Sequence, residues 1–378
     1  MQVAMIAADF TAGEADELRR AMAAWKRKGG LEKYQDRIMT GMQKNGYDPG
    51  FAKAIFEQIK GFGEYGFPES HAAGFALLVY TSSWLKCHEP EAFLAGLLNS
   101  QPLGFYSPSQ LVQDAKRHGV KVLPVDVTIS GWDSTLESIK GAERPAVRLG
   151  LSLLRGMKED AAQRIGNSRA LRPFRSVHDL ARRAQLDRHD LHVLADANAL
   201  AALAGNRREA LWHSVAAVPD KDMLAVAAVE DETPELGAPS EGNEIVADYR
   251  SVGLTLGRHP LQLLRPQLLA NRLMPASTLH SYPDGRLARA CGIVTVRQRP
   301  GTAKGVIFVT LEDETGNVNV IVWPGLLERQ RKEVLGASLL AVYGVWQREG
   351  EVQHLVAQRL VDMSHLLGGL QSTSRDFC

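Results

Sequence analysis

The sequence predicts a multidomain α + β fold, with helices in its first half and a β-rich domain near its end. Helix start signals and helical apolar spacing recur up to about residue 118. A segment rich in Ala, Pro and acids, residues 214–248, separates this half from the rest. Five short segments with β-type apolar patterning follow residue 286. With 378 residues, the chain is long enough for several domains with cores of their own.

The composition is that of a globular protein without a strong overall charge. Hydrophobic residues make up 45% of the chain, charged residues make up 23%, and the net charge is +1. The three cysteines, Cys87, Cys291 and Cys378, are far apart, so we expect neither a zinc site nor a disulfide framework. The first residues lack the basic region of a signal peptide, and the longest apolar run, around residues 72–85, is too short to span a bilayer. These features predict a cytoplasmic protein with no membrane partner.

Residues 1–130 are predicted to form a helical domain. Thr11 and Glu14 have the spacing of a capping box ahead of a helix over residues 15–28. Ser107-Pro108 starts a later helix. Between them lies a wholly apolar helix, and we expect its large side chains to lie in a core: Phe75, Leu78, Val79 and Leu85.

Arg19 and Arg20 are adjacent in the first long helix. Guanidinium groups bind phosphates through bidentate hydrogen bonds, so this pair is a candidate phosphate clamp. The alternative is a solvated helix face on which the two arginines pair with Asp16 and Glu17.

Residues 144–213 form the most basic block of the chain. They hold 13 Lys and Arg against 7 Asp and Glu, whereas residues 214–248 hold one Lys and nine acids. A local excess of positive charge favours contact with phosphates, and an acidic segment poor in apolar periodicity favours a flexible linker. We therefore predict a nucleic-acid-binding region over residues 131–213 and an acidic linker over residues 214–248.

The segment Leu154-Arg155-Gly156-Met157-Lys158, followed by two acids and a helix, resembles the hairpin of a helix-hairpin-helix motif. Such a hairpin presents backbone N–H groups at a helix N-terminus to a DNA phosphate without reading bases. The resemblance implies contacts from the hairpin residues, and Lys158 stands where the usual motif has a second glycine. The alternative is an ordinary helix turn. A partial second unit is expected around residues 196–208.

The β-rich region has the element order of an OB-fold, a small barrel that binds oligonucleotides. The expected strands cover residues 288–298, 306–312, 318–323, 339–347 and 353–361, with a helix over 324–335 between the third and fourth. Glu314-Thr315-Gly316-Asn317 is a hairpin turn signal. We place the barrel at residues 286–365, a connecting helical segment at 249–285 and a tail at 366–378.

The barrel contains basic and aromatic residues that suit single-stranded DNA. The basic residues between the first two strands, Arg297, Arg299 and Lys304, are candidate phosphate contacts. Trp323 and Trp346 are candidates for stacking on unpaired bases, and the alternative for each ring is to fill the barrel. Phe308 lies among apolar neighbours and is expected in the core.

We find no residues suited to a two-metal phosphoryl-transfer site. Glu312, Asp313 and Glu314 lie at a hairpin, where acids are common, and no Asp-x-Asp pair lies on an expected strand. We therefore predict that this chain itself binds no cofactor. The acidic segment also lacks an evident sliding-clamp peptide of the Gln-x-x-Leu/Met-Phe type.

The chain resembles a known protein family over nearly its whole length. Two segments carry this resemblance most clearly: EYGFPESHAAGFALLVYTSSWLKCHEP, residues 64–90, and GVIFVTLEDETGNVNVIVW, residues 305–323. The first resembles the end of the fingers domain in bacterial C-family replicative DNA polymerases of the alpha-subunit type, and the second resembles the OB domain of their error-prone branch. The resemblance implies a C-terminal part of such a polymerase, lacking the PHP, palm and thumb portions. It also implies that Arg19 and Arg20 reach the triphosphate of the incoming nucleotide.

For the family, the resemblance implies nucleotidyl transfer from a deoxynucleoside triphosphate to a primer 3′-OH, with Mg²⁺ as the metal. The implied partners are duplex primer–template, single-stranded template, deoxynucleoside triphosphates, and other mutagenesis-cassette or replisome proteins. Two hypotheses stay open. The chain is either part of a polymerase, active with a palm supplied elsewhere, or a stand-alone DNA-binding module from a truncated or split gene.

Overall fold

The computed structural model describes residues 2–28, 32–64, 69–104, 106–217, 235–300, 303, 305–370 and 374–377. The chain divides into two compact units, residues 1–87 and residues 88–378. The boundary differs from the expected helical domain over residues 1–130. The reason is that Leu94, Leu98 and Val112 share one core with residues that follow position 130.

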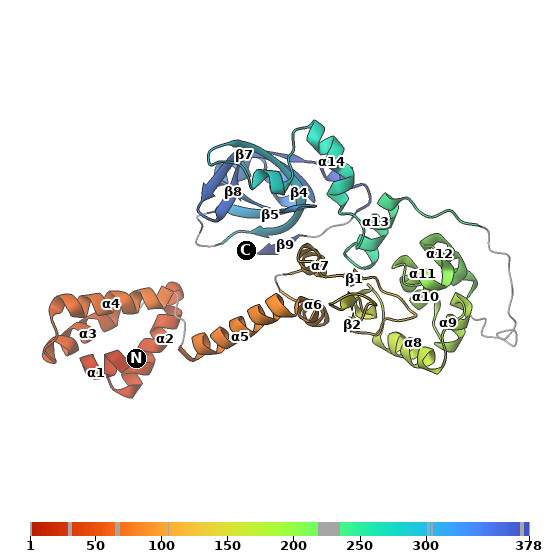
Figure 1. The fold of residues 1–378 in the computed structure, drawn as a ribbon. Helices are drawn as coiled ribbons and strands as arrows, with labels where there is room; N and C mark the ends of the chain where they lie inside the picture. Colours follow the sequence, from red (N-terminus) through yellow and green to blue (C-terminus); the bar gives the residue numbers. More distant parts are fainter. Residues whose placement is uncertain are drawn as a thin grey trace. The chain divides into compact units, whose positions relative to one another are not determined.

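The first unit is helical. It contains α1 (Gln2–Ala8), α2 (Ala12–Lys28), α3 (Glu32–Lys44), α4 (Pro49–Glu64) and most of α5 (Glu69–His88) (Figure 1). Its core gathers Leu18, Ile38, Met42 and Phe56, all less than 5% exposed. The capping box before α2 is confirmed, because Thr11 N–H donates to Glu14 Oε2 at 2.7 Å and Glu14 N–H donates to Thr11 Oγ1 at 3.3 Å.

The prediction that the large side chains of α5 lie in a core is wrong for this chain. Leu78 is 62% exposed, Val79 is 61% exposed and Phe75 is 45% exposed, while Leu85 is half-buried. The apolar character of the helix was correctly recognised, but Leu78 and Val79 face solvent in this structure.

The second unit begins with α6 (Pro90–Asn99) and α7 (Pro108–Arg117), which pack beside a small sheet. The sheet has the strand order β1 (Val122–Leu123), β3 (Ala146–Arg148), β2 (Thr135–Glu137), with β1 parallel and β2 antiparallel to β3. The start of α7 was correctly predicted. Ser107 caps it, and the Ser107 and Gln110 side chains form a capping box with each other's backbone N–H groups.

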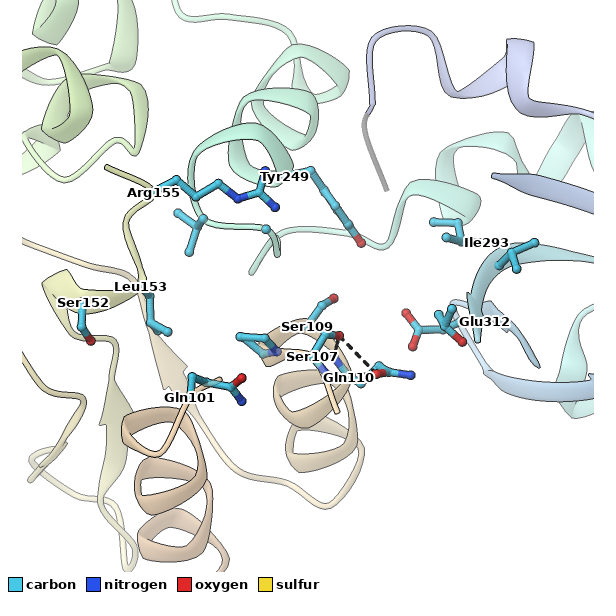
Figure 2. Close-up of a pocket in the computed structure, with 15 residues that line it drawn as sticks. Gln101, Ser107, Ser109, Gln110, Ser152, Leu153, Arg155, Tyr249, Ile293 and Glu312 are labelled. Carbon is cyan, nitrogen blue, oxygen red and sulfur yellow. Dashed lines mark hydrogen bonds between the residues drawn. The ribbon is translucent and has the colours of Figure 1, made fainter. Parts of the chain in front are cut away.

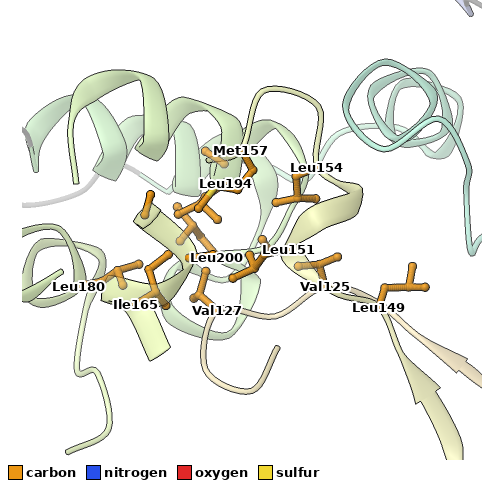
Figure 3. Close-up of a cluster of buried hydrophobic side chains, with 14 of the residues drawn as sticks. Val125, Val127, Leu149, Leu151, Leu154, Met157, Ile165, Leu180, Leu194 and Leu200 are labelled. Carbon is orange, nitrogen blue, oxygen red and sulfur yellow. The ribbon is translucent and has the colours of Figure 1, made fainter. Parts of the chain in front are cut away.

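The basic block folds into short helices around one hydrophobic core. These elements are η1 (Leu151–Leu153), α8 (Glu159–Leu171), α9 (Val177–Arg183), α10 (Arg188–Asp196), α11 (Ala201–Ala204) and α12 (Arg207–Ala216). Figure 3 shows Leu151, Ile165, Leu180 and Leu194 converging from separate elements on this core, and each is fully buried. Their packing fixes the loops that join the helices.

The bounds expected for the acidic linker are wrong at both ends. Helix α12 continues to Ala216, residues 218–234 lie outside the described residues, and residues 241–251 form helix α13 (Glu241–Ser251). Ser240 caps α13, and its Ile245 and Tyr249 are buried. Several acids that were expected in the flexible linker are instead part of a folded helix.

Helices α14 (Pro260–Ala270) and α15 (Ala276–Leu279) then lead to the barrel, which is confirmed as an OB-fold. Its strands are β4 (Leu287–Gln298), β5 (Ile307–Asp313), β6 (Gly316–Val322), β7 (Leu339–Glu349) and β8 (Val352–Asp362). They follow the order β5–β6–β8–β7–β4, and pairing of β4 with β5 closes the sheet. Helices α16 (Pro324–Arg329) and α17 (Arg331–Gly336) lie between β6 and β7 in the sequence, as expected.

The C-terminal tail contains more structure than was predicted. After η2 (Ser364–Leu367), residues 375–377 form strand β9 (Arg375–Phe377), which pairs parallel with the end of β4 (Figure 1). Part of the segment predicted as a tail therefore belongs to the sheet.

Candidate nucleic-acid interface

The turn before α8 has the backbone geometry of a tight hairpin. Gly156 has φ +89°, a conformation that favours glycine, while Lys158 has φ −97° and ψ 141°, which any residue adopts. Lysine at the position of the second glycine therefore introduces no backbone strain. Lys158 is the N-cap residue of α8, and its side chain makes no capping hydrogen bond. The exposed Lys158 ammonium thus lies beside the N-terminal end of a helix, where anions are favoured.

Two of the other hairpin residues have structural roles. The Arg155 backbone N–H donates to Ser251 O at 2.9 Å, and Arg155 Nη1 donates to Arg250 O at 3.2 Å, which connects the hairpin to the end of α13. The Met157 side chain is 9% exposed and belongs to the core, so a DNA contact at this residue would involve its backbone and not its side chain. Its apolar side chain anchors the hairpin from below.

The first turn of α8 also carries negative charge. Glu159 and Asp160 lie there, and Arg164 Nη1 donates to Asp160 Oδ2 at 2.7 Å. This hydrogen bond holds the pKa of Asp160 below its usual range. A phosphate at this helix end would therefore meet both the attraction of Lys158 and the repulsion of ionised carboxylates.

Several arginines of the basic block bind carboxylates or backbone carbonyl groups of the protein itself. Arg148, 8% exposed, pairs with Glu137 at 2.7 Å and donates to Pro124 O. Arg169 donates to Val127 O at 2.7 Å and to Ser130 O at 2.9 Å. Arg207, 5% exposed, pairs with Glu244 at 2.6 Å and with Asp248 at 2.5 Å in α13. These side chains hold elements together and are not available to phosphates.

A second group of arginines remains at the surface around α9. Three guanidinium groups, those of Arg172, Arg182 and Arg183, lie within 4 Å of the single Asp179 carboxylate. Although burial alone would raise the pKa of Asp179, hydrogen bonds from the Arg175 N–H and from Arg183 lower it. Arg172, Arg175 and Arg182 are exposed, so this cluster keeps a surplus of positive charge that faces solvent.

Two expected DNA contacts of the barrel are buried. Trp346 is 0% exposed in the barrel core, and its ring lies 5.9 Å from that of His280. Arg297 is 7% exposed and donates to Val334 O at 2.7 Å and Ala337 O at 2.5 Å. Both expectations are therefore wrong. Strand β4 runs through Gln298, as the expected strand over residues 288–298 did, so Arg297 lies in the sheet and not between the first two strands.

The barrel has three further predicted DNA contacts: Arg299, Lys304 and Trp323. Arg299 is exposed, and Lys304 lies outside the described residues. Trp323 follows β6 and is 55% exposed, so its ring is accessible to an unpaired base.

The outer face of β5 and β6 forms a surface beside Trp323. Along β5 the buried residues alternate with Phe308 and Thr310, which are half-buried. Phe308 pairs in register with Ile321, and Thr310 pairs with Asn319. Phe308 therefore lies on the outer face, and its assignment to the core is wrong. This strand alternation was visible in the sequence, and it could have identified the surface.

Arg19 and Arg20 lie on the exposed side of α2, where both pair with Asp16. Arg19 Nε lies 2.9 Å from Asp16 Oδ1, and Arg20 Nη2 lies 2.5 Å from Asp16 Oδ2. The two hydrogen bonds lower the pKa of Asp16. The ion pairs with Asp16 match the alternative to a phosphate clamp, in which both arginines lie on a solvated helix face.

The second unit contains a cavity that the sequence did not reveal. It has a volume of about 380 Å³ and is lined by side chains from the segment around α7, from α13 and from the barrel. Figure 2 shows Ser109, Tyr249 and Glu312 facing it from these three parts. Burial and the nearby Glu312 carboxylate raise the pKa of Tyr249, and His259 Nε2 lies 3.5 Å from Glu312 Oε1.

Among the described residues, no group of three or more His, Cys, Asp or Glu side chains is arranged to hold a metal ion. Within the same residues, no helix is both long and apolar enough to cross a membrane.

Comparison with protein families defines the class of the modules. Residues 1–46 match the bacterial DNA polymerase III alpha subunit finger domain, residues 119–210 match a helix-hairpin-helix motif, and residues 288–362 match an OB-fold nucleic acid binding domain. The chain thus combines a polymerase finger segment with two modules of the nucleic-acid-binding kind, in the order that the sequence predicted.

Comparison with curated proteins identifies a particular family. The chain is 65% identical over 382 residues to an error-prone DNA polymerase of Burkholderia pseudomallei, and 62% and 59% identical to those of Bordetella parapertussis and Ralstonia pickettii. Each match covers 100% of this chain and 36% of the relative. The chain is therefore a homologue, over its whole length, of part of the error-prone DNA polymerases, as the resemblance indicated.

The likeness to one solved structure is weak. An asparaginyl-tRNA synthetase from Pyrococcus horikoshii matches 24% of this chain with a TM-score of 0.20 and 21% identity. This similarity is below the level that would define a shared fold.

Proposed function

We propose that this chain is the DNA-handling portion of an error-prone DNA polymerase that copies damaged templates. The observation that carries the proposal is the 65% identity over the whole chain, including the finger segment as well as the two binding modules. In the whole polymerase the reaction is nucleotidyl transfer from a deoxynucleoside triphosphate to a primer 3′-OH. A stand-alone DNA-binding module would not account for the finger segment.

The helix-hairpin-helix region is proposed to bind duplex DNA by contacting the phosphates of the DNA backbone. Lys158, at the N-terminus of α8, and the exposed arginines around α9 supply positive charge without base-reading geometry. Such contacts bind all sequences about equally, which suits a polymerase that must move along its template.

The outer β5–β6 face of the barrel is proposed to hold the unpaired template. Trp323 offers an aromatic surface for stacking, and Thr310 and Asn319 add polar groups beside it. Stacking tolerates every base, so the same face would accept damaged and undamaged template.

Arg19 and Arg20 are proposed to contact the triphosphate of the incoming nucleotide. Both side chains are more than 60% exposed, so their ion pairs with Asp16 are screened by water. Exposed ion pairs of this kind contribute little to stability, because water screens the two charges. Exchange of Asp16 for a triphosphate would therefore cost little.

Mg²⁺ is the metal expected for the family reaction, and the described residues of this chain do not fit it. They contain no cluster of carboxylates of the kind that a two-metal site requires. We propose that the catalytic carboxylates come from the part of the polymerase that the relatives have in addition. The isolated chain would then be inactive, and no step of the chemistry is assigned to its residues.

We further propose a cytoplasmic location, where the DNA and deoxynucleoside triphosphates of a bacterial cell are found. Other proteins of a mutagenesis cassette or of the replisome are candidate partners.

A chimera tests the proposed function. The segment of the Burkholderia pseudomallei polymerase that aligns with this chain is replaced by this chain, and primer extension is measured on intact and lesion-containing templates. We expect the chimera to extend primers and the 378-residue chain alone to extend none. A folded chimera without extension activity, or robust extension by the purified chain alone, would contradict the proposal.

A further inference from the structure

The middle of helix α5, residues 72–80, is apolar on all of its sides and mostly exposed to solvent. Four consecutive residues, Leu77, Leu78, Val79 and Tyr80, are 73%, 62%, 61% and 72% exposed. Consecutive residues of an α-helix point about 100° apart, so these four side chains surround the helix. Between residues 70 and 85 the sequence contains no Asp, Glu, Lys or Arg.

A helix that is apolar all round is normally buried on all sides. No described helix is long and apolar enough to cross a membrane. Residues 72–80 of α5 also lack the charged face by which a helix lies on a membrane surface. A protein surface is therefore the better cover for this helix. Other large apolar side chains of the first unit are exposed as well: Val3, Ile6 and Phe51, at 51%, 74% and 50%. A contiguous exposed apolar surface, such as the one that residues 77–80 form on α5, marks a protein–protein contact.

We propose that α5 is a docking helix that inserts into an apolar groove in the remainder of the polymerase, the polypeptide that the relatives have outside the segment matched by this chain. This inference rests on the proposed function. The matched segment is only 36% of the relatives' length, so most of their polypeptide is available to form the groove. The absence of charged side chains from the centre of α5 requires that the groove be apolar.

A second copy of this chain explains the surface less well. Two copies that pair through α5 would cover one face of each helix and leave the opposite face in water. The exposed apolar residues lie on every face, and a groove in a larger protein covers them together. The partner is therefore inferred to be the polymerase remainder and not a symmetric dimer.

Thiol accessibility at two opposite positions tests the inference. Leu78→Cys and Tyr80→Cys place thiols about 200° apart around the helix. Each is made singly in this chain, with Cys87 and Cys378 replaced by Ser and the buried Cys291 retained. The same two cysteines are introduced at the aligned positions of the intact Burkholderia pseudomallei polymerase. The measurement is the rate of maleimide alkylation, divided by the rate for the same variant in denaturant.

We expect both thiols of this chain to react at nearly the denatured rate at all protein concentrations. In the intact relative, we expect both to react at least ~10-fold more slowly, since a covered thiol reacts only after local opening. The same positions in the short chain are the matched controls. Equal rates in the two proteins would overturn the inference. Slow reaction at one position only, or concentration-dependent protection in this chain together with a dimer mass by light scattering, would also overturn it.

A second measurement separates this inference from the proposed function. Leu78→Glu in this chain is expected to leave DNA affinity and thermal unfolding unchanged, because the side chain is exposed. The aligned substitution in the intact relative is expected to lower its thermal stability. If the chimera fails but the thiols of the relative are protected, the proposed function fails for this chain while α5 remains a docking helix in the relative. If the chimera works and the thiols react quickly, only the docking inference fails.

Discussion

Replacing Trp323 by Ala is expected to weaken single-stranded DNA binding while the barrel stays folded. Stacking of one base on an aromatic side chain contributes roughly 1–3 kcal/mol, which corresponds to a loss of about 5- to 150-fold in affinity. The stability cost is limited because Trp323 is 55% exposed in the folded protein. A fully buried Trp side chain removes roughly 200 Å² of surface from water. Less than half of that area is buried at Trp323, so its replacement by Ala lowers the free energy of unfolding by at most about 2 kcal/mol.

The buried tryptophan of the same barrel supplies the contrast. Trp346 is 0% exposed, so Trp346→Ala is expected to destabilise the barrel by about 3–5 kcal/mol. The assays are fluorescence anisotropy with a labelled oligothymidylate and circular dichroism of urea unfolding. Duplex binding by the Trp323 variant is expected to remain within about twofold of the unsubstituted chain, because phosphate contacts dominate it. A folded Trp323→Ala variant that binds single strands normally, or that loses duplex and single-strand binding equally, would refute the assignment of the β5–β6 face.

Three further predictions concern charged residues. Lys158→Ala is expected to weaken duplex binding uniformly across sequences and to reduce the slope of log affinity against log salt by about 0.9, whereas a change of slope near zero would show that no phosphate is bound there. Arg207→Ala leaves the Glu244 and Asp248 carboxylates beside an unfilled site and should destabilise the second unit by about 3–5 kcal/mol in urea unfolding, while the exposed Arg208→Ala should change little. The hydrogen bond from Arg148 lowers the pKa of Glu137, so its stabilising effect is present above the pKa of the unfolded chain and is lost as the pH falls through the lower, folded pKa. Glu137→Gln should therefore flatten the decrease of thermal stability between about pH 5 and pH 3, and an unchanged pH profile would contradict this linkage.

The order of the modules and the barrel could be predicted from sequence because their signals are local. Alternation of apolar residues marks the strands, and Glu314 and Thr315 form the two-residue loop of the hairpin between β5 and β6. The capping residues Thr11 and Ser107 act within one helical turn, so their roles were visible in the sequence. Strand β9 was missed because only its pairing with β4, far away in the sequence, makes it a strand.

Candidate contacts were harder to predict because charge and aromaticity do not specify burial. The excess of arginine in residues 144–213 suggested a phosphate-binding face, but Arg148 and Arg207 are each less than 10% exposed and bind carboxylates or carbonyl groups of the protein itself. Arginine suits this use because one planar group donates several hydrogen bonds in a fixed geometry. The same ambiguity separates Trp323 from Trp346, which differ in exposure and not in type. Residue type therefore selects candidates, and the partner that each side chain meets in the fold decides which of them remain available to DNA.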